Sequence, residues 1–220
     1  MISDYVILVM EWIGTVAFSV SGALVSISCG LDLFGVITVG CITAVGGGVI
    51  RDLLIGSVPP QIFFNPWLIL LAAVTSAAVF AIAYFNARRF KGLRARVENI
   101  NIIFDAIGLA AFSVAGVETV CAAGFADKEL LVITLGLITG VGGGILRDIL
   151  VNEKPYVLTK HVYAVASIFG CAIYYLFSTC WNMKILGTFV ALIFIITVRM
   201  LAAKYRWKLP KIKFEEKEEN

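Results

Sequence analysis

Three stretches without any charged residue constrain this chain more than any other feature of its sequence. Residues 12–31, 53–87 and 162–183 contain no Asp, Glu, Lys or Arg over 20, 35 and 22 positions. A helix that crosses a bilayer needs about 20 largely apolar residues. Only 15% of all residues are charged, whereas soluble domains contain about 25%, and the mean hydropathy is +0.94. The sequence therefore predicts an all-α membrane protein.

Apolar segments alternate with polar or proline-containing linkers and predict seven transmembrane helices. We expect the helices at residues 5–28, 33–55, 65–87, 100–122, 128–150, 160–179 and 184–204. Proline disfavours the helical conformation of the residue before it, so Pro59 and Pro155 mark helix ends. We expect a single transmembrane domain over residues 1–205 and a polar cytoplasmic tail over 206–220.

Basic residues gather in linkers that share one side of this arrangement. Five lie within 88–96 after the third span, two flank the link between spans five and six, and six follow span seven. The opposite side has only Lys128 and Lys184. Because basic residues stay cytoplasmic, we expect a protein of the cell inner membrane with its N-terminus outside and its C-terminus in the cytoplasm. These residues also indicate contact with anionic membrane lipids, and nothing in them requires nucleic acid.

The first half of the chain repeats in the second half. At an offset of 96, residues 37–59 match 133–155, including Val-Gly-Gly-Gly at 45–48 and 141–144. At an offset of 94, Phe-Ser-Val at 18–20 matches 112–114, and Glu11 matches Asp105. Spans one to three (5–87) therefore repeat as spans four to six (100–179), and the seventh helix (184–204) is additional. A repeat of three spans must be inverted in the membrane, and inverted repeats are a hallmark of transport proteins, with a shared site near the midplane.

Two glycine triplets lie at equivalent positions past the middle of spans two and five. They are Gly46, Gly47, Gly48 and Gly142, Gly143, Gly144. Each glycine costs about 1 kcal/mol relative to alanine in a helix, so a triplet is a point at which a helix can bend. One interpretation is a kink that turns backbone carbonyls toward a water-filled pore. The other is close helix packing, since Gly40, Ala44 and Gly48 recur every four residues. Both can hold together.

Hydroxyl and aromatic side chains near the triplets are candidates for lining such a pore. Hydroxyl oxygens can replace water around a monovalent cation. The hydroxyl candidates are Ser19, Thr43, Ser113 and Thr139. Phe18 and Phe112 each lie between glycines spaced four residues away, on one helix face. The two rings either pack the helices together or form an apolar constriction that gates by dewetting.

Ionisable residues inside the spans are expensive in a bilayer and are functional candidates. They are Glu11, Arg51, Asp52, Asp105, Glu118, Arg147, Asp148 and Arg199. Because neighbours i and i+1 on a helix do not face each other, we expect each arginine to find a partner away from the adjacent aspartate. Arg51 is expected near Glu11 or Glu118, and Arg147 near Asp105. One interpretation is that these pairs lock the helices together. The other is that the residues of the outer half form a pore mouth that attracts cations, because they comprise one arginine and three carboxylates: Arg51, Glu11, Asp52 and Glu118.

The doubled Gly-Gly-Gly-x-x-Arg-Asp motif in a plan of three plus three plus one helices resembles the bacterial branch of the trimeric intracellular cation (TRIC) channels, a branch that also carries the domain name "glycine transporter". The resemblance covers about residues 1–205. It implies a homotrimer with a pore inside each subunit, permeation of potassium with some sodium, and glycine kinks at both triplets beside that pore. Thr43-Ala44-Val45 stands where animal members have Lys-Glu-Val, so the gating of animal channels is not carried over.

Two functions are compatible with these patterns. The first is a monovalent cation channel that conducts K⁺ and some Na⁺, and the second is a small-solute secondary transporter, for example of glycine. An enzyme is not expected, because no Ser/His or His/His spacing suggests a catalytic site. No cofactor and no tightly bound metal are expected, since the five cysteines form no Cys-x-x-Cys pair; K⁺ would be present only in transit.

Overall fold

The computed structural model describes residues 2–86, 94–159 and 162–207. These residues form helices and connecting turns, and the expected seven membrane-spanning helices are confirmed. The long helices are α1 (Ile2–Ser28), α2 (Leu33–Leu54), α3 (Pro66–Phe85), α5 (Arg94–Val120), α6 (Glu129–Leu150), α8 (Tyr163–Tyr175) and α9 (Lys184–Lys204). The short elements are η1 (Gln61–Phe63), η2 (Cys121–Phe125), α7 (Tyr156–Thr159) and η3 (Leu176–Cys180).

Most expected helix ends agree with the structure to within a few residues, and two differ. The fourth helix begins at Arg94 instead of residue 100, because its first turns over 94–99 are polar and do not register in an apolar span. The sixth expected helix, 160–179, corresponds to α8 followed by η3, and its residues 160–161 lie outside the described part; the short α7 precedes it, in the expected linker. Of the expected tail, residues 208–220 also lie outside it.

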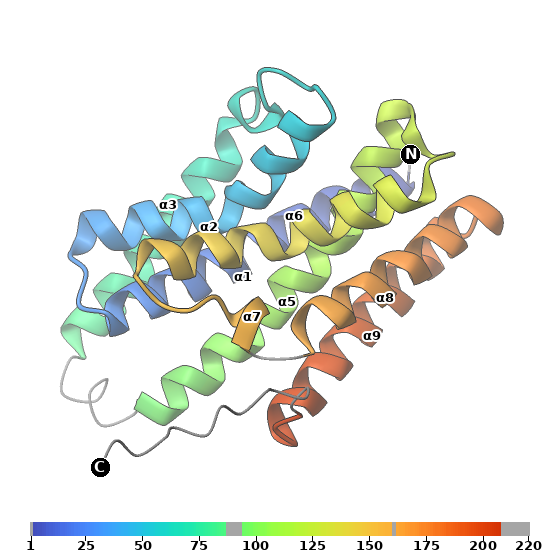
Figure 1. Cartoon of the computed structure of the whole chain (residues 1–220). Coiled ribbons are helices and arrows are strands. Elements are labelled where there is room, and N and C mark those ends of the chain that lie inside the picture. The colour runs from blue at the N-terminus through green and yellow to red at the C-terminus, as the bar shows by residue number, and fades with distance from the viewer. Residues whose placement is uncertain (1, 87–93, 160–161, 208–220) are drawn as a thin grey trace, which may run out of the picture.

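The two repeats are interleaved in the structure. Helices α1 and α5 run along each other, α2 packs on α6, α3 covers α1 and α2, and α8 covers α5 and α6 (Figure 1). The inverted repeat is therefore confirmed as a structural pseudo-symmetry that exchanges α1 with α5, α2 with α6 and α3 with α8. Helix α9 has no counterpart and packs on α5 and α8.

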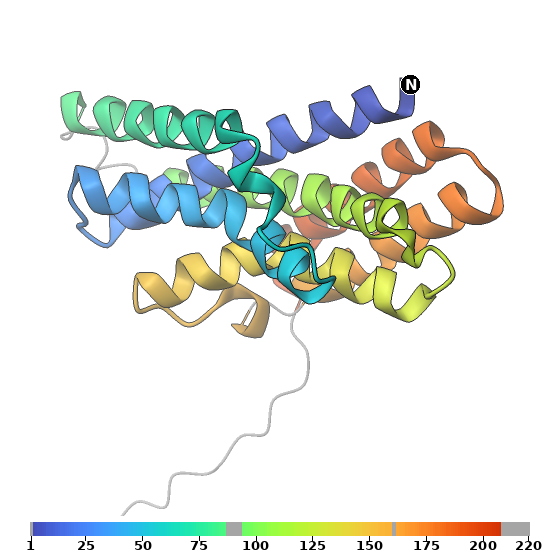
Figure 2. The same cartoon turned by 90° about the horizontal axis from the view of Figure 1, so that it is seen from above.

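The bundle has two ends, which are named here for the chain termini. The N-side is the end where α1 begins, and it also carries the end of α2, η1, η2 and the turn before α9. The C-side is the end where α9 finishes. Figure 2 shows the N-terminus at one extreme of the bundle and α3, which returns from the N-side, beside α1.

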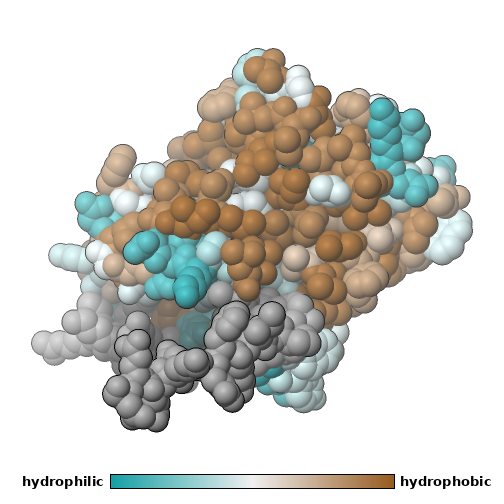
Figure 3. Space-filling model, viewed as in Figure 1, coloured by the Kyte–Doolittle hydropathy of each residue, from teal (hydrophilic) through white to brown (hydrophobic). Residues whose placement is uncertain are grey.

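Burial separates a central helix from helices at the edge. In the most apolar 18-residue stretch of the span that contains most of α5, 67% of the residues are buried inside the protein. In the corresponding stretch of α3, 22% are buried. The exposed residues of α3 are apolar, among them Trp67, Leu70, Val74 and Ile82. Figure 3 shows apolar residues covering the middle of the visible face, with hydrophilic residues toward opposite ends. This pattern fits a bundle whose flanks contact lipid.

Candidate functional site

The glycine triplets form the point at which α2 and α6 touch backbone to backbone. A Cβ atom on Gly47 would overlap the carbonyl of Thr139, and one on Gly143 would overlap the carbonyl of Thr43. A Cβ on Gly142 would lie 3.0 Å from the Cα atom of Gly47. These contacts support the packing interpretation of the triplets, because only hydrogen fits between the two backbones.

Both helices remain α-helical through their triplets. Helix α2 nevertheless changes direction along its length, as Figures 1 and 2 show. Close packing and a bend therefore coexist in α2. The second half of α2, which follows its crossing with α6, leads toward the N-side.

Three of the four hydroxyl candidates bond within their own helices. Thr43, Thr139 and Ser19 each donate a hydrogen bond of 2.6 Å to the carbonyl four residues earlier. The hydroxyl of Ser113 instead lies 2.7 Å from that of Ser167 on α8. All four candidates are at most 1% exposed. Their hydrogens are therefore committed or shared inside the bundle, while their oxygen atoms retain acceptor capacity.

The two phenylalanines meet between the repeats, as the repeat predicts. Their ring centroids lie 5.3 Å apart at an interplanar angle of 39°, a distance typical of an aromatic pair. Phe18 is 1% exposed and lies against Gly108, where a Cβ atom would overlap its ring. Phe112 is half-buried and lies in the same way against Gly14. The rings thus occupy the pseudo-two-fold centre.

The expectation that adjacent Arg and Asp residues do not pair is wrong at both positions. Arg51 donates to Oδ1 of Asp52 from Nε at 2.9 Å and from Nη2 at 2.7 Å. Arg147 donates from Nε to Oδ1 of Asp148 at 2.8 Å. Each arginine stands in the last turn of its helix, where its long side chain can curl back over the neighbouring residue. The rule that residues i and i+1 do not face each other holds for side chains that project from the surface of a regular helix. A long arginine side chain at a helix end is not bound by it.

Each of these aspartates also anchors the segment that follows its helix. The second carboxylate oxygen of Asp52 accepts a hydrogen bond of 2.9 Å from the backbone N–H of Gln61. Asp148 does the same at 2.8 Å with the N–H of Tyr156. Gln61 opens η1 and Tyr156 opens α7, so each aspartate ties a short helix, whose start lacks internal partners, to the preceding long helix.

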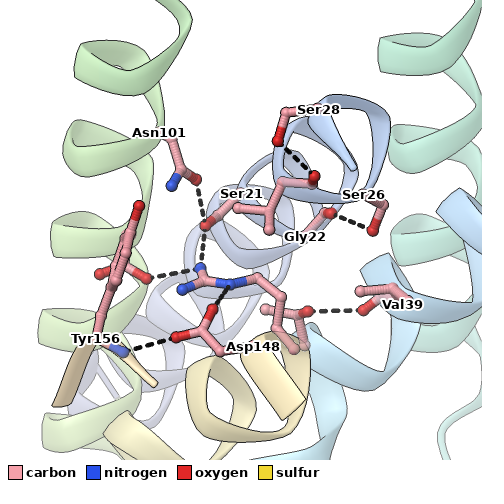
Figure 4. A network of polar contacts seen from close by, with 12 residues as sticks. Ser21, Gly22, Ser26, Ser28, Val39, Asn101, Asp148 and Tyr156 are labelled. Carbon is pink, nitrogen blue, oxygen red and sulfur yellow. Dashed lines mark hydrogen bonds and ion pairs between the residues drawn. The ribbon is translucent and has the colours of Figure 1, made fainter. Parts of the chain in front are cut away.

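A buried polar network on the C-side holds Arg147. Its Nη1 atom donates to Oδ1 of Asp105 at 2.9 Å, which is the predicted pair, and also to the hydroxyl of Ser21 on α1. Ser21 in turn donates to the side-chain oxygen of Asn101 at 2.7 Å. Figure 4 shows Ser21, Asn101, Asp148 and Tyr156 converging from different helices. Arg147 and Asp105 are both 0% exposed.

Helix α9, which lies outside the repeat, adds a second arginine to this network. Nη2 of Arg199 lies 3.4 Å from Oδ2 of Asp105, and its guanidinium stands 4.2 Å from the ring centroid of Tyr163. Arg199 is 4% exposed. The C-side network therefore joins α1, α5, α6, α8 and α9 through Asp105 and Arg147. Burying such ions is costly unless each is fully paired.

Among the described residues, the N-side has no equivalent network. Neither expected partner pairs with Arg51: Glu118 accepts hydrogen bonds from Tyr174 at 2.8 Å and from Lys184. Glu11, the counterpart of Asp105, makes no hydrogen bond or ion pair with any residue in the described part of the chain. The two halves of the repeat thus share a backbone plan and differ in their polar contacts.

Two cavities occupy the place of that missing network. The larger, of about 580 Å³, opens at the N-side and is lined by Glu11, Gln61 and Glu118 among others. The smaller, of about 110 Å³, is lined by Glu11, Gln61, Arg51, Gly48, Phe112 and Thr139. Because Glu11 and Gln61 line both, the cavities adjoin. Together they lead from the N-side to the aromatic pair at the centre.

Comparisons with known proteins agree with this architecture. A family model described as "Glycine transporter" matches residues 8–84 and 102–179, which are the two repeats. The inner membrane protein YadS of Escherichia coli K12 is 34% identical over 212 residues, covering 94% of this chain and 96% of that protein.

The chain belongs to the glycine transporter family.

Other members and solved structures extend the likeness. The membrane protein YvgT of Bacillus subtilis is 34% identical over 202 residues, covering 92% of this chain and 94% of that protein. The structure of a prokaryotic TRIC channel in 0.5 M KCl is 35% identical, with a TM-score of 0.83 over 94% of this chain and all (100%) of that one. A TRIC channel orthologue from Rhodobacter sphaeroides is 28% identical, with a TM-score of 0.81 over 92% of this chain and 99% of that one. The predicted resemblance to bacterial TRIC channels is confirmed.

Some polar residues of this family member were not singled out from its sequence. They are Ser21, Gln61, Asn101 and Tyr163, together with Lys184, which the sequence marks only as a basic residue of the outer side. Asn101 carried a usable signal, because it stands four residues before Asp105 and so shares its helix face. The others belong to linkers or to helices whose neighbours cannot be read from the sequence.

Proposed function

We propose that this protein is a monovalent cation channel of the cell inner membrane, which conducts K⁺ with some Na⁺ through a passage inside each subunit of a homotrimer. The observation that carries the proposal is the adjoining pair of cavities between the repeats, which leads from the N-side to Phe112 and Thr139. The solved structures that resemble the chain are those of TRIC cation channels, which supports the same function.

The passage would continue across the crossing of α2 and α6. Its N-side part is lined by Glu11 and Gln61 and, further in, by Thr139; such residues carry oxygen acceptors suited to a partly dehydrated cation. Its C-side part would run beside Asp105 and Arg147, whose burial closes this conformation there. Conduction then requires these side chains and the Phe18–Phe112 pair to move apart.

The orientation in the proposal follows from the basic residues. The N-side, which has few of them, would face outward, and the C-side would face the cytoplasm. In that orientation the cavities form an outer vestibule. Phe34 on the C-side and Phe63 on the N-side are both exposed. In intact cells, a membrane-impermeant thiol reagent should label Phe63→Cys and leave Phe34→Cys unlabelled.

Transport of a small zwitterion such as glycine is the second candidate. It is favoured by one observation: Glu11 and Arg51, which have opposite charges, both line the cavity of about 110 Å³. An amino group at Glu11 and a carboxylate at the free Nη1 of Arg51 would suit such a solute. In this case the same site would be occupied by a solute and not by a hydrated ion.

Recording from the purified protein in planar bilayers separates the two candidates. Unitary currents whose reversal potential follows the K⁺ gradient, with a smaller Na⁺ contribution, are expected. Glycine uptake is measured in liposomes made from the same preparation. Saturable glycine uptake without unitary current would refute the channel and support the transporter.

A further inference from the structure

Glu11 is a carboxylate inside the first membrane span, and it forms no hydrogen bond or ion pair with the described residues. It is half-buried on α1. Its repeat-equivalent, Asp105, contacts two arginines, at 2.9 Å and 3.4 Å. Arg51, whose charge acts on Glu11, is itself paired with Asp52 at 2.7 Å. A carboxylate in such surroundings favours a cation supplied from solution.

The larger cavity next to Glu11 has the size and chemistry of a ligand site. Its volume of about 580 Å³ falls within the range of about 300–1,000 Å³ typical of small-molecule sites. Ile7, Leu8 and Phe125 give it apolar walls, while Gln61 adds a polar side chain beside Glu11. Apolar walls around one carboxylate without an ion-pair partner among the described residues suit a cation that carries alkyl groups better than a bare inorganic ion.

The remaining carboxylate of this cavity is already in use. Glu118 accepts from Tyr174 with one oxygen and from Lys184 with the other. A divalent cation needs several oxygen ligands, about six to eight for Ca²⁺, and the described residues contain no group of three or more metal-binding side chains. One unpaired carboxylate therefore points to a monovalent ligand.

The cavity narrows before it reaches the centre. The adjoining cavity of about 110 Å³ also contacts Glu11, and it is lined on its inner part by Phe112, whose ring lies against Phe18. A bulky cation that fills the larger cavity cannot follow K⁺ past this point. On the C-side, the repeat-equivalent carboxylate of Asp105 is 0% exposed, so the same cation does not reach it from that direction in this conformation.

From this arrangement we propose that the N-side cavity is a binding site for small alkylammonium ions, with Glu11 as the charge that holds them. Where the protein conducts as proposed above, such an ion blocks the passage from the N-side. The cavity supplies the contacts for the alkyl arms, and the narrowing at Phe112 prevents permeation. The proposal assigns the two glutamates of one cavity different roles, since Glu11 binds the ligand and Glu118 binds Lys184.

The direct test is binding of tetraethylammonium to the purified protein, measured by saturation-transfer NMR in detergent, which does not depend on conduction. We expect transfer to the ethyl protons in the wild type and about a tenfold or greater rise in the dissociation constant in Glu11→Gln, because an ion pair is lost. Glu129→Gln is the matched control: it removes the same charge from an exposed N-side position outside the cavity. Equal affinities in the wild type and Glu11→Gln, or an equal loss in Glu129→Gln, would overturn the proposal.

Bilayer recording adds the position of the site. Tetraethylammonium added on the N-side should reduce the K⁺ current at concentrations that have no effect from the C-side, and Glu11→Gln should raise the half-blocking concentration about tenfold. Gel filtration confirms that each variant remains folded and assembled. Block that is equal from both sides contradicts the proposed site even when the channel conducts. Absence of any current refutes the proposed function instead, and the NMR titration then decides the binding site alone.

Discussion

Neighbouring glycines in one triplet should respond to alanine in opposite ways. At Gly47 a Cβ atom would overlap the carbonyl of Thr139, a backbone group that cannot rotate aside. At Gly48 the nearest atom to an added Cβ is Nη2 of Arg51 at 3.7 Å, an ordinary contact. Both positions lie in the same helix one residue apart. The pair therefore separates the cost of helix crossing from the cost of glycine in a helix.

The expected difference can be worked from these contacts. Alanine gains about 1 kcal/mol over glycine in a helix interior at either position. Overpacking of a tight contact costs about 1–3 kcal/mol, and the rigid backbone partner places Gly47→Ala at the upper end. Gly47→Ala should thus lose about 2 kcal/mol and Gly48→Ala gain about 1 kcal/mol, a gap of about 3 kcal/mol. For a chain of this size that corresponds to about 6–12 °C in melting temperature.

Thermal unfolding of the detergent-solubilised protein, followed by tryptophan fluorescence, measures the gap. Gly143→Ala should behave like Gly47→Ala, because its Cβ atom would overlap the carbonyl of Thr43 in the same way. If the triplets existed only to weaken the helix at a bend, both alanine variants would stiffen it alike. Equal melting temperatures for Gly47→Ala and Gly48→Ala would therefore refute the packing argument.

Five further substitutions test the contrast between the two sides and the centre. Arg147→Met leaves two buried aspartates without their shared partner and should cost about 3–5 kcal/mol, whereas Arg51→Met, beside an open cavity, should cost clearly less; equal losses in chemical unfolding contradict the asymmetry. Lys184→Met removes a partly exposed ion pair and should change stability by only about 0–1 kcal/mol. Phe112→Ala widens the smaller cavity and should raise the unitary conductance; a lower conductance would speak against a constriction at this ring. Phe18→Ala, at a fully buried site, should cost about 3–5 kcal/mol of stability.

The sequence predicts the relation between the halves because the repeat is written in residues that contact each other. Phe18 and Phe112 match at one offset and meet at 5.3 Å. Gly47 and Gly143 match at the other offset and each fits against a threonine carbonyl of the opposite helix. In a twofold arrangement, two equivalent residues that lie close to the axis also lie close to each other. The predicted pair of Arg147 and Asp105, which both belong to the second repeat, is also confirmed.

The same logic fails where the two halves have different neighbours. Arg51 was expected near Glu11 or Glu118, yet it bonds to Asp52, and Glu118 bonds to Lys184. The start of α9 supplies Lys184 on one side, and its last turns supply Arg199 on the other. Since α9 lies outside the repeat, its contacts cannot be derived from the pseudo-symmetry.

The sequence by itself determined the number of helices, their approximate limits and the inversion of the repeats, because apolar length and an odd number of crossings are properties of one segment at a time. Tertiary structure alone decided which charges pair, because a side chain as long as arginine can reach several carboxylates and the choice depends on what else is packed nearby. It also decided that the N-side is hollow while the C-side is filled. That asymmetry arises where Ser21 and Arg199 reach the C-side network and Glu11 is left facing a cavity.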